Sequence, residues 1–379
     1  MYSRLIKPPA RTSFFLFGPR GTGKTTWLKQ NFPNALYYDL LDPQTYHDFL
    51  AQPGNIEIYT KKEKFDWIII DEIQMVPELL NAVHRLIENE HYKFILTGSS
   101  ARKLRQKGVN LLGGRALNYH MHPLTALELG ADFDLEKALQ FGLMPSIFSV
   151  DDPKKYLFSY IKTYLYEEVE QEGMTRNLSS FARFLETASF SQGSVLNVSE
   201  VAREAMVERK VVENYFTILD DLLVATQIPV FTKKAKRKMI THNKFYFFDA
   251  GIYRTIRPMG PFDDPNGVSG IALETLFLQN LRAINDYFDL GYKIYYYRTV
   301  LGVEVDFVVY GPKGVFAFEI KGSKKFSERD LSGLRAFLSD YPIAKCYLIY
   351  GGDRKMYYDN IEVWPAKEAL MNLPKILEN

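Results

Sequence analysis

One segment of the chain reads Gly18-Pro19-Arg20-Gly21-Thr22-Gly23-Lys24-Thr25. It lies between an apolar run over residues 13–17, which predicts a buried strand, and a helix expected to begin near Thr26. Glycines here let backbone N–H groups close around phosphates, while Lys24 reaches the β- and γ-phosphates and the Thr25 hydroxyl is placed to ligate Mg²⁺. The segment therefore predicts an ATP site built from Gly18, Pro19, Arg20, Gly21, Thr22, Gly23, Lys24, Thr25 and Thr26. The alternative is a Gly-rich turn without a ligand, which the order strand, loop and helix disfavours.

A second apolar run, residues 65–70, ends in the two carboxylates Asp71 and Glu72. Such a run is typical of a buried parallel strand. We expect Asp71 to hold Mg²⁺ through water and Glu72 to orient and deprotonate the attacking water, since phosphoryl transfer needs positioning and charge neutralisation above all. The alternative is an acidic residue that caps the following helix.

The next predicted strand, residues 93–96, runs into Thr97-Gly98-Ser99-Ser100. The hydroxyls of Thr97 and Ser99 are candidates for contact with the γ-phosphate or the lytic water. Gly and Ser also make ordinary turns, which is the alternative interpretation of this segment.

These motifs resemble the AAA-like class of P-loop ATPases, in which an extra strand separates the loop strand from the Asp-Glu strand. Residues 93–97 correspond to that inserted strand. The resemblance implies a nucleotide at a subunit interface of a homo-oligomer, with an arginine from the neighbour stabilising charge on the transferring phosphoryl group. Arg115 is the first candidate, ahead of Arg102 and Arg105, and a solvated surface arginine is the alternative.

Composition limits the other functions. The chain has 379 residues, a formal net charge of +2 and 46% hydrophobic residues, enough for about two to four domains with real cores. The single cysteine, Cys346, excludes an internal disulfide framework, and the six histidines show no zinc-ligand spacing. Every apolar run is too short for a signal peptide or a membrane span. We therefore expect a cytoplasmic protein without a membrane partner, in which DNA contact requires a local basic patch.

One basic patch lies in residues 233–238, between an apolar stretch and an aromatic strand. Upstream, apolar spacing predicts helices over residues 178–191, 198–205 and 209–222. Short helix, turn, longer helix and basic hairpin resemble a winged helix-turn-helix, which would offer the major groove Arg209 and Lys210. The predicted phosphate contacts of its wing are Lys233, Lys234, Lys236, Arg237 and Lys238. Because Glu204, Glu208 and Glu213 make the longer helix nearly neutral, packing or protein contact is an equal alternative.

Two alternating strands over residues 302–321 predict a β-hairpin around Gly311-Pro312-Lys313-Gly314. If Tyr310 pairs with Val315, then Asp306 lies across from Glu319, Glu304 lies across from Lys321, and all four face one side. The other side carries a row that must be buried: Val305, Phe307, Val309, Phe316, Phe318 and Ile320.

Directly opposed carboxylates repel each other, so a compensating charge is expected. A divalent metal held by Asp306 and Glu319, with Lys321 stabilising a developing phosphate charge, predicts a hydrolytic site. The alternatives are a surface charge ladder and a bulge that changes the register.

The pattern of Asp306, Glu319 and Lys321 is similar to the restriction-endonuclease-like nucleases. That resemblance implies Mg²⁺- or Mn²⁺-dependent cleavage of DNA and adds Glu274, in the preceding helix, as an acidic site residue. The whole order resembles a prokaryotic family of predicted ATPases with an AAA-like core, a winged-helix middle and a restriction-endonuclease-like C-terminus. Its further motifs here are Leu111–Arg115 leading to His122–Leu124, Gly142–Pro145 and Tyr246–Gly251.

The predicted fold class is α/β with four parts. They are a P-loop ATPase core (1–124), a helical lid or connector (125–175), a winged helix (176–245) and a restriction-endonuclease-like domain (246–379). The predicted function is an Mg²⁺-dependent ATPase acting on DNA, with a metal-dependent nuclease site in the last domain. The rival prediction is an ATP-binding switch that docks a protein or DNA partner without cleaving it.

Overall fold

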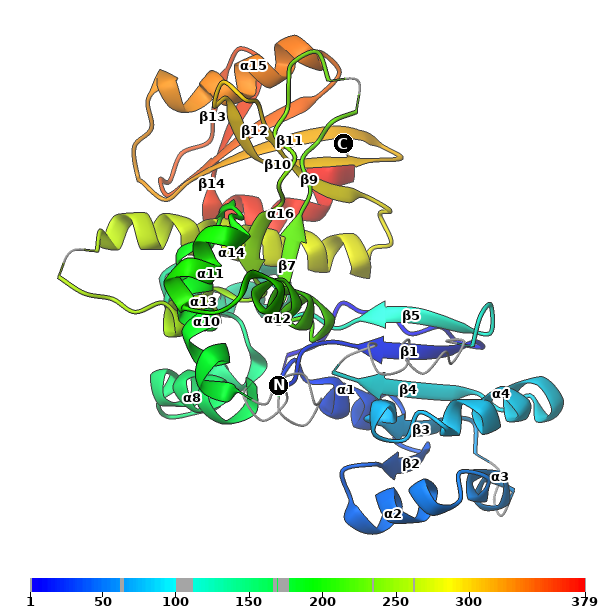
Figure 1. Cartoon of the computed structure of the whole chain (residues 1–379). Coiled ribbons are helices and arrows are strands. Elements are labelled where there is room, and N and C mark those ends of the chain that lie inside the picture. The colour runs from blue at the N-terminus through cyan, green and yellow to red at the C-terminus, as the bar shows by residue number, and fades with distance from the viewer. Residues whose placement is uncertain are drawn as a thin grey trace. The chain divides into compact units, whose positions relative to one another are not determined.

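The computed structural model describes residues 2–61, 65–99, 112–165, 169, 177–233, 235–261 and 263–378. Contacts divide the chain into two compact units (Figure 1). The first unit holds residues 4–123 with 221–223, and the second holds residues 1–3, 124–220 and 224–379. Lys234, Arg102 and Arg105 lie outside the described residues.

The first unit is built on a parallel five-stranded sheet in the order β2-β3-β4-β1-β5. Its strands are β1 (Ser13–Phe17), β2 (Leu36–Asp39), β3 (Ile68–Asp71), β4 (Phe94–Gly98) and β5 (Ala116–His120). The order confirms the inserted strand, because β4 separates the loop strand β1 from the Asp-Glu strand β3.

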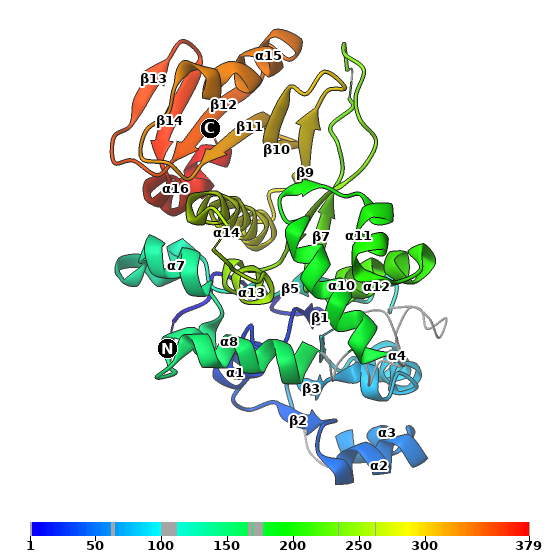
Figure 2. The same ribbon diagram turned by 60° about the vertical axis from the view of Figure 1, so that its left-hand side comes forward.

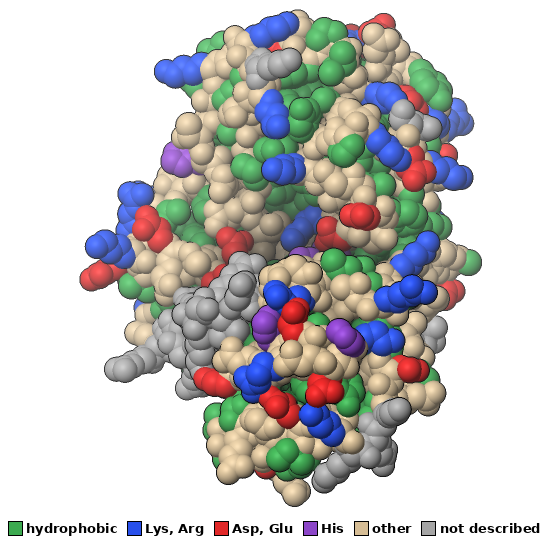
Figure 3. Space-filling view, turned by 90° about the vertical axis from the view of Figure 1, so that its right-hand side faces the viewer, with side chains coloured by type: hydrophobic (Ala, Val, Ile, Leu, Met, Phe, Trp, Pro, Cys, Tyr) green, Lys and Arg blue, Asp and Glu red, His purple; other side chains and the backbone are tan. Residues whose placement is uncertain are grey.

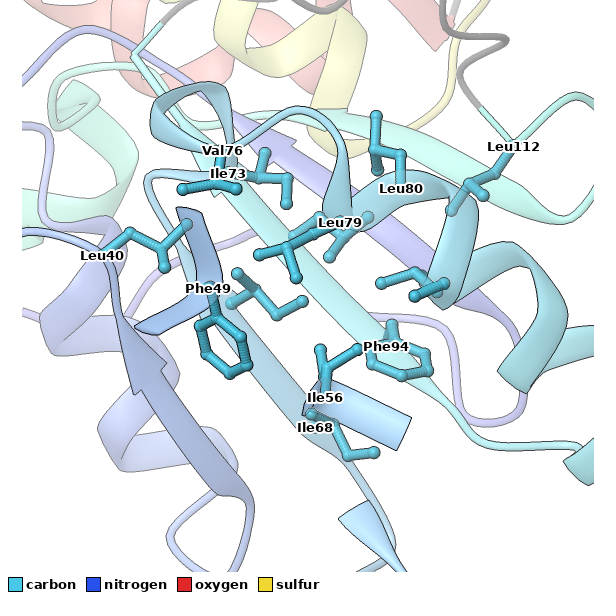
Figure 4. Close-up of a cluster of buried hydrophobic side chains, with 14 of the residues drawn as sticks. Leu40, Phe49, Ile56, Ile68, Ile73, Val76, Leu79, Leu80, Phe94 and Leu112 are labelled. Atoms are coloured by element: carbon cyan, nitrogen blue, oxygen red, sulfur yellow. The ribbon is translucent and has the colours of Figure 1, made fainter. Parts of the chain in front are cut away.

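Both faces of this sheet are covered. On one face Phe14 contacts Phe32 at the end of α1 (Lys24–Asn31). The opposite face packs against α2 (Pro43–Ala51), α3 (Asn55–Thr60) and α4 (Leu79–Glu90). Figure 4 shows the core on this face, in which Phe49, Ile56, Ile68 and Phe94 belong to one cluster of buried side chains. Burial on both faces explains the continuous apolar runs of the strands and fixes their ends in space.

The second unit begins with short helices that pack on its C-terminal half. They are α6 (Ala126–Leu129), α7 (Leu135–Phe141) and α8 (Pro153–Ser159), with helical turns at 130–132, 145–148 and 160–165. Helix α7 packs against α13 (Ala250–Ile256) and α14 (Pro265–Tyr287). The buried Asp249 carboxylate caps α13 and also accepts the Leu143 N–H at 2.8 Å, so one side chain joins two distant segments.

Three helices and a small antiparallel sheet follow. The helices are α10 (Leu178–Phe190), α11 (Val198–Ala205) and α12 (Arg209–Asp221). The sheet has the order β6-β8-β7, with β6 (Ser194–Val195), β7 (Ala225–Ile228) and β8 (Lys244–Phe247). Aromatic rings of Phe184, Phe216 and Phe245 pack in sequence and join α10, α12 and β8 into one core.

The C-terminal sheet has six strands in the order β13-β14-β12-β11-β10-β9. These are β9 (Lys293–Arg298), β10 (Glu304–Gly311), β11 (Gly314–Lys321), β12 (Lys345–Tyr350), β13 (Met356–Tyr358) and β14 (Ile361–Pro365). Helices α14 and α16 (Ala366–Glu378) cover one face, while the turn at 328–331 and α15 (Ser332–Asp340) cover the other (Figure 2).

The loop between β7 and β8 belongs to two substructures. Phe231 lies in the core under α15, and its N–H donates to the Tyr296 carbonyl of β9 at 2.7 Å. Farther along, the Val300 N–H donates to the Lys238 carbonyl at 2.9 Å. Strand β8 itself runs across the predicted boundary between residues 245 and 246. The middle and C-terminal parts are therefore interleaved.

Candidate functional site

The phosphate-binding loop connects the carboxyl end of β1 to α1. Gly21 and Gly23 have φ values of 80° and 91°, a left-handed conformation that glycine adopts without a steric penalty. At Gly18 an added Cβ would lie 2.4 Å from the backbone oxygen of Met121. The observed loop thus requires glycine at the three positions where the predicted phosphate-binding loop has it.

Lys24 lies at the start of α1, where the helix dipole favours an anion. Its side chain is buried, and Nζ donates to the carbonyls of Gly18 at 2.7 Å and Pro19 at 3.3 Å. The Thr22 hydroxyl donates to the Pro19 carbonyl at 2.8 Å. A phosphate would offer Lys24 charged acceptors, which make stronger hydrogen bonds than these carbonyls.

Asp71, the buried last residue of β3, accepts hydrogen bonds from three hydroxyl groups. Thr25 Oγ1 donates to Asp71 Oδ2 at 2.9 Å, and the Tyr37 hydroxyl of β2 donates to the same oxygen. The Thr97 hydroxyl of β4 donates to Oδ1. Burial, followed by the Asp71 charge, raises the pKa of Tyr37, so this phenol stays a donor. The strand ends bring these groups together because the parallel strands terminate at one edge of the sheet.

Glu72 follows Asp71 in a left-handed conformation, with φ 60° and ψ 47°. That conformation is uncommon for a residue with a side chain and marks a constrained position. The Glu72 N–H donates to Thr97 Oγ1 at 3.2 Å, and its carboxylate accepts a hydrogen bond from Gln74 Nε2. Gln74 Nε2 also lies 3.2 Å from Ser99 Oγ. The structure thus brings together Glu72, Thr97 and Ser99.

The oxygen donors at this edge fit Mg²⁺. Mg²⁺ prefers a few protein oxygens completed by phosphate and water. The Thr25 hydroxyl and the Asp71 carboxylate lie 2.9 Å apart and meet that requirement. Arg20 and Thr26 are exposed, and their predicted ATP contacts stay predictions.

Arg115 does not reach this edge within its own chain. It precedes β5, and Ala116 pairs with Ser13 at the amino end of β1. Its guanidinium pairs with Glu88 of α4. The length of β1, about 16 Å, therefore separates Arg115 from the phosphate-binding loop of its own chain. A contact with the nucleotide of a neighbouring subunit stays a prediction.

In the second unit a buried lysine joins three carboxylates. Lys244 begins β8, and its side chain is 2% exposed. Its Nζ lies 2.9 Å from Asp306 Oδ1, 3.0 Å from Glu304 Oε1 and 3.5 Å from Glu274 Oε2. The Tyr246 hydroxyl of β8 donates to Glu274 Oε2 at 2.9 Å. Two predicted nuclease-side acids, Glu274 and Asp306, therefore meet Glu304 at a cation that the sequence prediction did not include.

Burial changes the proton affinities in this cluster. It raises the pKa of Glu274 to about 7; the Asp306 charge adds to this rise and Lys244 opposes it. Burial and the Asp306 charge also raise the pKa of Glu319. For Lys244, burial lowers the pKa, but the surrounding acids outweigh it, so the pKa is raised. Lys244 therefore stays charged inside the protein.

The hairpin confirms the predicted register over most of its length, since Tyr310 pairs with Val315 and Phe307 with Phe318. The row predicted to be buried is buried. A bulge between Val305 and Val308 nevertheless places both of these valines against the α15 side, while Phe307 stacks on Phe277 of α14. Strict alternation over residues 304–307 is therefore wrong, because one extra residue reverses the faces.

The ion pairs beside the hairpin also differ from the predicted arrangement. Glu304 pairs with Arg298 at 3.1 Å, whereas Lys321 pairs with Glu319 at 3.2 Å and with Asp330 at 3.7 Å. The predicted position of Glu304 across from Lys321 thus does not produce an ion pair between them.

These residues do not fit the metal ion that the nuclease resemblance implies. Asp306 Oδ1 pairs with Lys244 and Oδ2 accepts the Ile320 N–H at 2.9 Å. Glu319 Oε1 pairs with Lys321, and Glu319 Oε2 is buried without a hydrogen-bond partner. Among the described residues, no group of three or more His, Cys, Asp or Glu side chains is arranged to hold a metal ion. We therefore derive no hydrolytic step at this cluster.

The predicted DNA-binding side chains are exposed but partly engaged. Arg209 pairs with Glu213 at 2.9 Å on α12. Arg237 pairs with Asp340 at 2.8 Å, and Lys233 lies 4.1 Å from the centre of the Tyr310 ring. Figure 3 shows one face on which basic side chains are interspersed with acidic ones. Lys210, Lys236 and Lys238 are also exposed.

Sequence reasoning missed Tyr37, Gln74 and Lys244. Tyr37 gives no local signal, because its role depends on the pairing of β2 with β3. Gln74 follows Glu72 by two residues, a spacing that could have drawn attention to it. Lys244 is a lone cation that opens an aromatic strand, and an isolated charge in a buried strand requires a buried partner.

Comparison with known proteins divides the chain into three segments. Residues 10–130 match the AAA domain family, residues 132–263 match a domain family of unknown function (DUF8612), and residues 269–369 match another (DUF4143). Across the described ranges, no helix is both long and apolar enough to span a bilayer.

Individual relatives are distant. An uncharacterised protein of Haemophilus influenzae is 23% identical over 256 residues, 62% of each chain. An uncharacterised protein of Methanocaldococcus jannaschii is 24% identical over 268 residues, 62% of this chain and 60% of its own. The chain thus spans about three fifths of these curated relatives.

A solved structure, the Aeropyrum pernix ORC1 protein in complex with DNA, matches 66% of this chain and 87% of its own, with 13% identity and a TM-score of 0.28. A likeness that weak carries no argument for this protein. The sheet order, the glycine-dependent loop and the match over residues 10–130 support a P-loop ATPase family of the AAA type for the N-terminal part of the chain.

Proposed function

We propose that the protein is an Mg²⁺-dependent ATPase. The observation that supports this most is the convergence of Thr25, Thr97 and Tyr37 on Asp71, with Glu72 held beside them. Such an edge combines a phosphate-binding helix start, oxygen ligands for Mg²⁺ and a carboxylate for water.

The roles follow from position. Lys24 would hold the β- and γ-phosphates, and Thr25 with Asp71 would hold Mg²⁺, which would neutralise charge on the phosphate oxygens. Glu72 accepts a proton from the attacking water, and the Gln74 hydrogen bond orients its carboxylate. Thr97 hydrogen-bonds to both the Glu72 backbone and the Asp71 side chain, and so holds these two acidic residues in position relative to each other.

Replacing Lys24 by Ala should weaken ATP binding about a hundredfold, because the buried ammonium is the charge that the phosphates meet in the loop. Titration of a fluorescent ATP analogue with Mg²⁺ measures this loss. Lys61→Ala, which removes a surface ion pair with Glu90, is the control and should bind normally. Unchanged ATP affinity in Lys24→Ala would contradict the proposed site.

A second candidate function is DNA binding coupled to the nucleotide state. It is favoured by the exposure of Lys233, Lys236, Arg237 and Lys238 on the β7–β8 loop, beside a three-helix arrangement like that of a winged helix. The rival is a switch that docks a protein partner, which the Arg209–Glu213 pair favours because it neutralises part of α12.

Salt dependence separates these two functions. DNA bound through the exposed cations should lose affinity about a hundredfold between 50 and 200 mM salt, because each neutralised phosphate releases a counterion. Fluorescence anisotropy with duplex DNA measures this slope, and Lys236→Ala with Lys238→Ala should make it shallower. If no DNA binding is measured at low salt, the partner is not DNA.

A further inference from the structure

The acidic cluster of the second unit contains its own cation. We propose that Lys244 takes the place of a divalent metal ion, as the resident counter-ion of Glu274, Glu304 and Asp306, and that this cluster therefore binds neither Mg²⁺ nor Mn²⁺. The proposal concerns the second unit and does not depend on ATP hydrolysis by the first.

Acidic groups surround the ammonium, which donates hydrogen bonds to Asp306 and Glu274 and pairs with Glu304. A lysine ammonium has three N–H donors. Lys244 Nζ has three carboxylates within 3.5 Å, two from β10 and one from α14. With only 2% of the side chain exposed, water contributes little to its solvation. The carboxylates thus replace water, which a buried charge requires.

A metal ion would have to compete with that ammonium. Mg²⁺ requires about six oxygen ligands at 2.0–2.1 Å. Two positive centres at the same carboxylates repel each other strongly in a buried site. Asp306, the acid that the nuclease prediction places at the metal, has one oxygen on Lys244 and the other on the Ile320 N–H. Both carboxylate oxygens of Asp306 therefore already have a protein partner.

Other basic side chains also neutralise acidic residues in and around the cluster without a metal ion. Arg298 neutralises Glu304 from the other side at 3.1 Å, and Lys321 pairs with Glu319 at 3.2 Å. Tyr246 donates to Glu274. The remaining candidate for a metal ligand is Glu319 Oε2, which lacks a hydrogen-bond partner among the described residues. A single carboxylate oxygen does not make a divalent site, and the experiment includes this residue.

The ion pairs of Lys244 connect different structural elements. Lys244 begins β8, whereas its three partners lie on α14 and β10. The ammonium therefore ties the small antiparallel sheet to the C-terminal sheet at the place where a nuclease would hold its metal. The cluster is a structural joint and not a hydrolytic centre.

The test is Mn²⁺ binding to nucleotide-free, full-length protein, measured by calorimetry and by the EPR signal of free Mn²⁺. Every protein carries Asp71→Asn, so that the ATP site does not contribute. With Lys244 intact we expect no saturable site. Lys244→Gln should gain a saturable Mn²⁺ site, with an affinity at least about tenfold higher than any Mn²⁺ binding by the protein with Lys244 intact. The substitution frees three carboxylates for a cation. Adding Asp306→Asn should remove that site again.

Lys355→Gln is the matched control, because Lys355 pairs with the single carboxylate of Glu362 in the same sheet. It should gain no site. Mn²⁺ binding with Lys244 intact that is lost in Asp306→Asn or Glu319→Gln would overturn the proposal, and so would a folded Lys244→Gln protein that gains none. If Lys244→Gln does not fold, the titration with Lys244 intact decides alone.

Discussion

Glu72→Gln is expected to lower kcat for ATP hydrolysis about a thousandfold and to leave the dissociation constant of Mg²⁺-ATP unchanged within about twofold. Glutamine has the size of glutamate and keeps an oxygen for the hydrogen bond from Gln74. It cannot take a proton from water at neutral pH. The loss should therefore appear in the chemical step and not in binding.

Steady-state hydrolysis and nucleotide titration on the same samples measure the two quantities. Glu90→Gln, which changes a surface carboxylate paired with Lys61, is the control and should retain full activity. A tenfold or smaller loss in Glu72→Gln would contradict the role of Glu72 as the base and would leave positioning by Thr97 and Ser99 as the main contribution.

Asp249→Ala is expected to lower the free energy of unfolding by about 4 kcal/mol. The carboxylate is fully buried and accepts the N–H groups of Leu143 at 2.8 Å, Gly251 at 2.8 Å and Ile252 at 3.1 Å. Alanine leaves three buried donors without an acceptor. Urea denaturation measures the difference.

The matched control is Asp152→Ala, because Asp152 also caps a helix but is exposed and accepts one backbone N–H, from Lys155. Its loss should be about 1 kcal/mol. Equal losses at the two positions would show that capping alone accounts for Asp249 and that the link to Leu143 adds nothing.

The same carboxyl group gives stability a pH dependence. Burial raises the pKa of Asp249 to about 6, from a usual value of 3.8. The folded state therefore binds this proton more tightly than the unfolded chain, and the resulting stabilisation is complete below pH 3.8 and is lost as pH rises through 6. Relative to Asp249→Asn, which does not titrate, the native protein should gain about 2 kcal/mol between pH 7 and pH 4. An opposite slope would contradict the pKa shift.

Local patterns predicted much of the fold. Helices expected over 178–191, 198–205 and 209–222 are observed at 178–190, 198–205 and 209–221. These segments have strong helical spacing, and Asn177 and Asn197 cap the first two, so nearby residues determine their limits. The glycines of the phosphate-binding loop could also be predicted, because the conformation of the loop depends on its own residues.

What depends on distant pairing could not be predicted. The position of Arg115 at the far end of β1 could not be predicted, because the sequence does not say which end of β5 meets which end of β1. The bulge before Phe307 is not marked by a glycine or a proline in the sequence. The predicted alternation of buried and exposed side chains was therefore extended across it. Lys244 was overlooked because its partners lie 30 or more positions away on other elements. The repulsion among the acids correctly predicted a compensating charge, but not that the chain itself supplies it.

The β7–β8 loop has a consequence for how such proteins can be rearranged in evolution. The backbones of Pro229 and Phe231 hydrogen-bond to Tyr296 of β9 and that of Ile240 to Arg298, while the flanking strands β7 and β8 form another sheet. A gene fusion that joined the last 130 residues to a different partner would lose Phe231 and Lys244. It would leave a cavity under α15 and an acidic cluster without its counter-ion. The middle and C-terminal segments should therefore be inherited as one unit. A gene fusion with its junction near residue 124 would instead leave all three sheets intact.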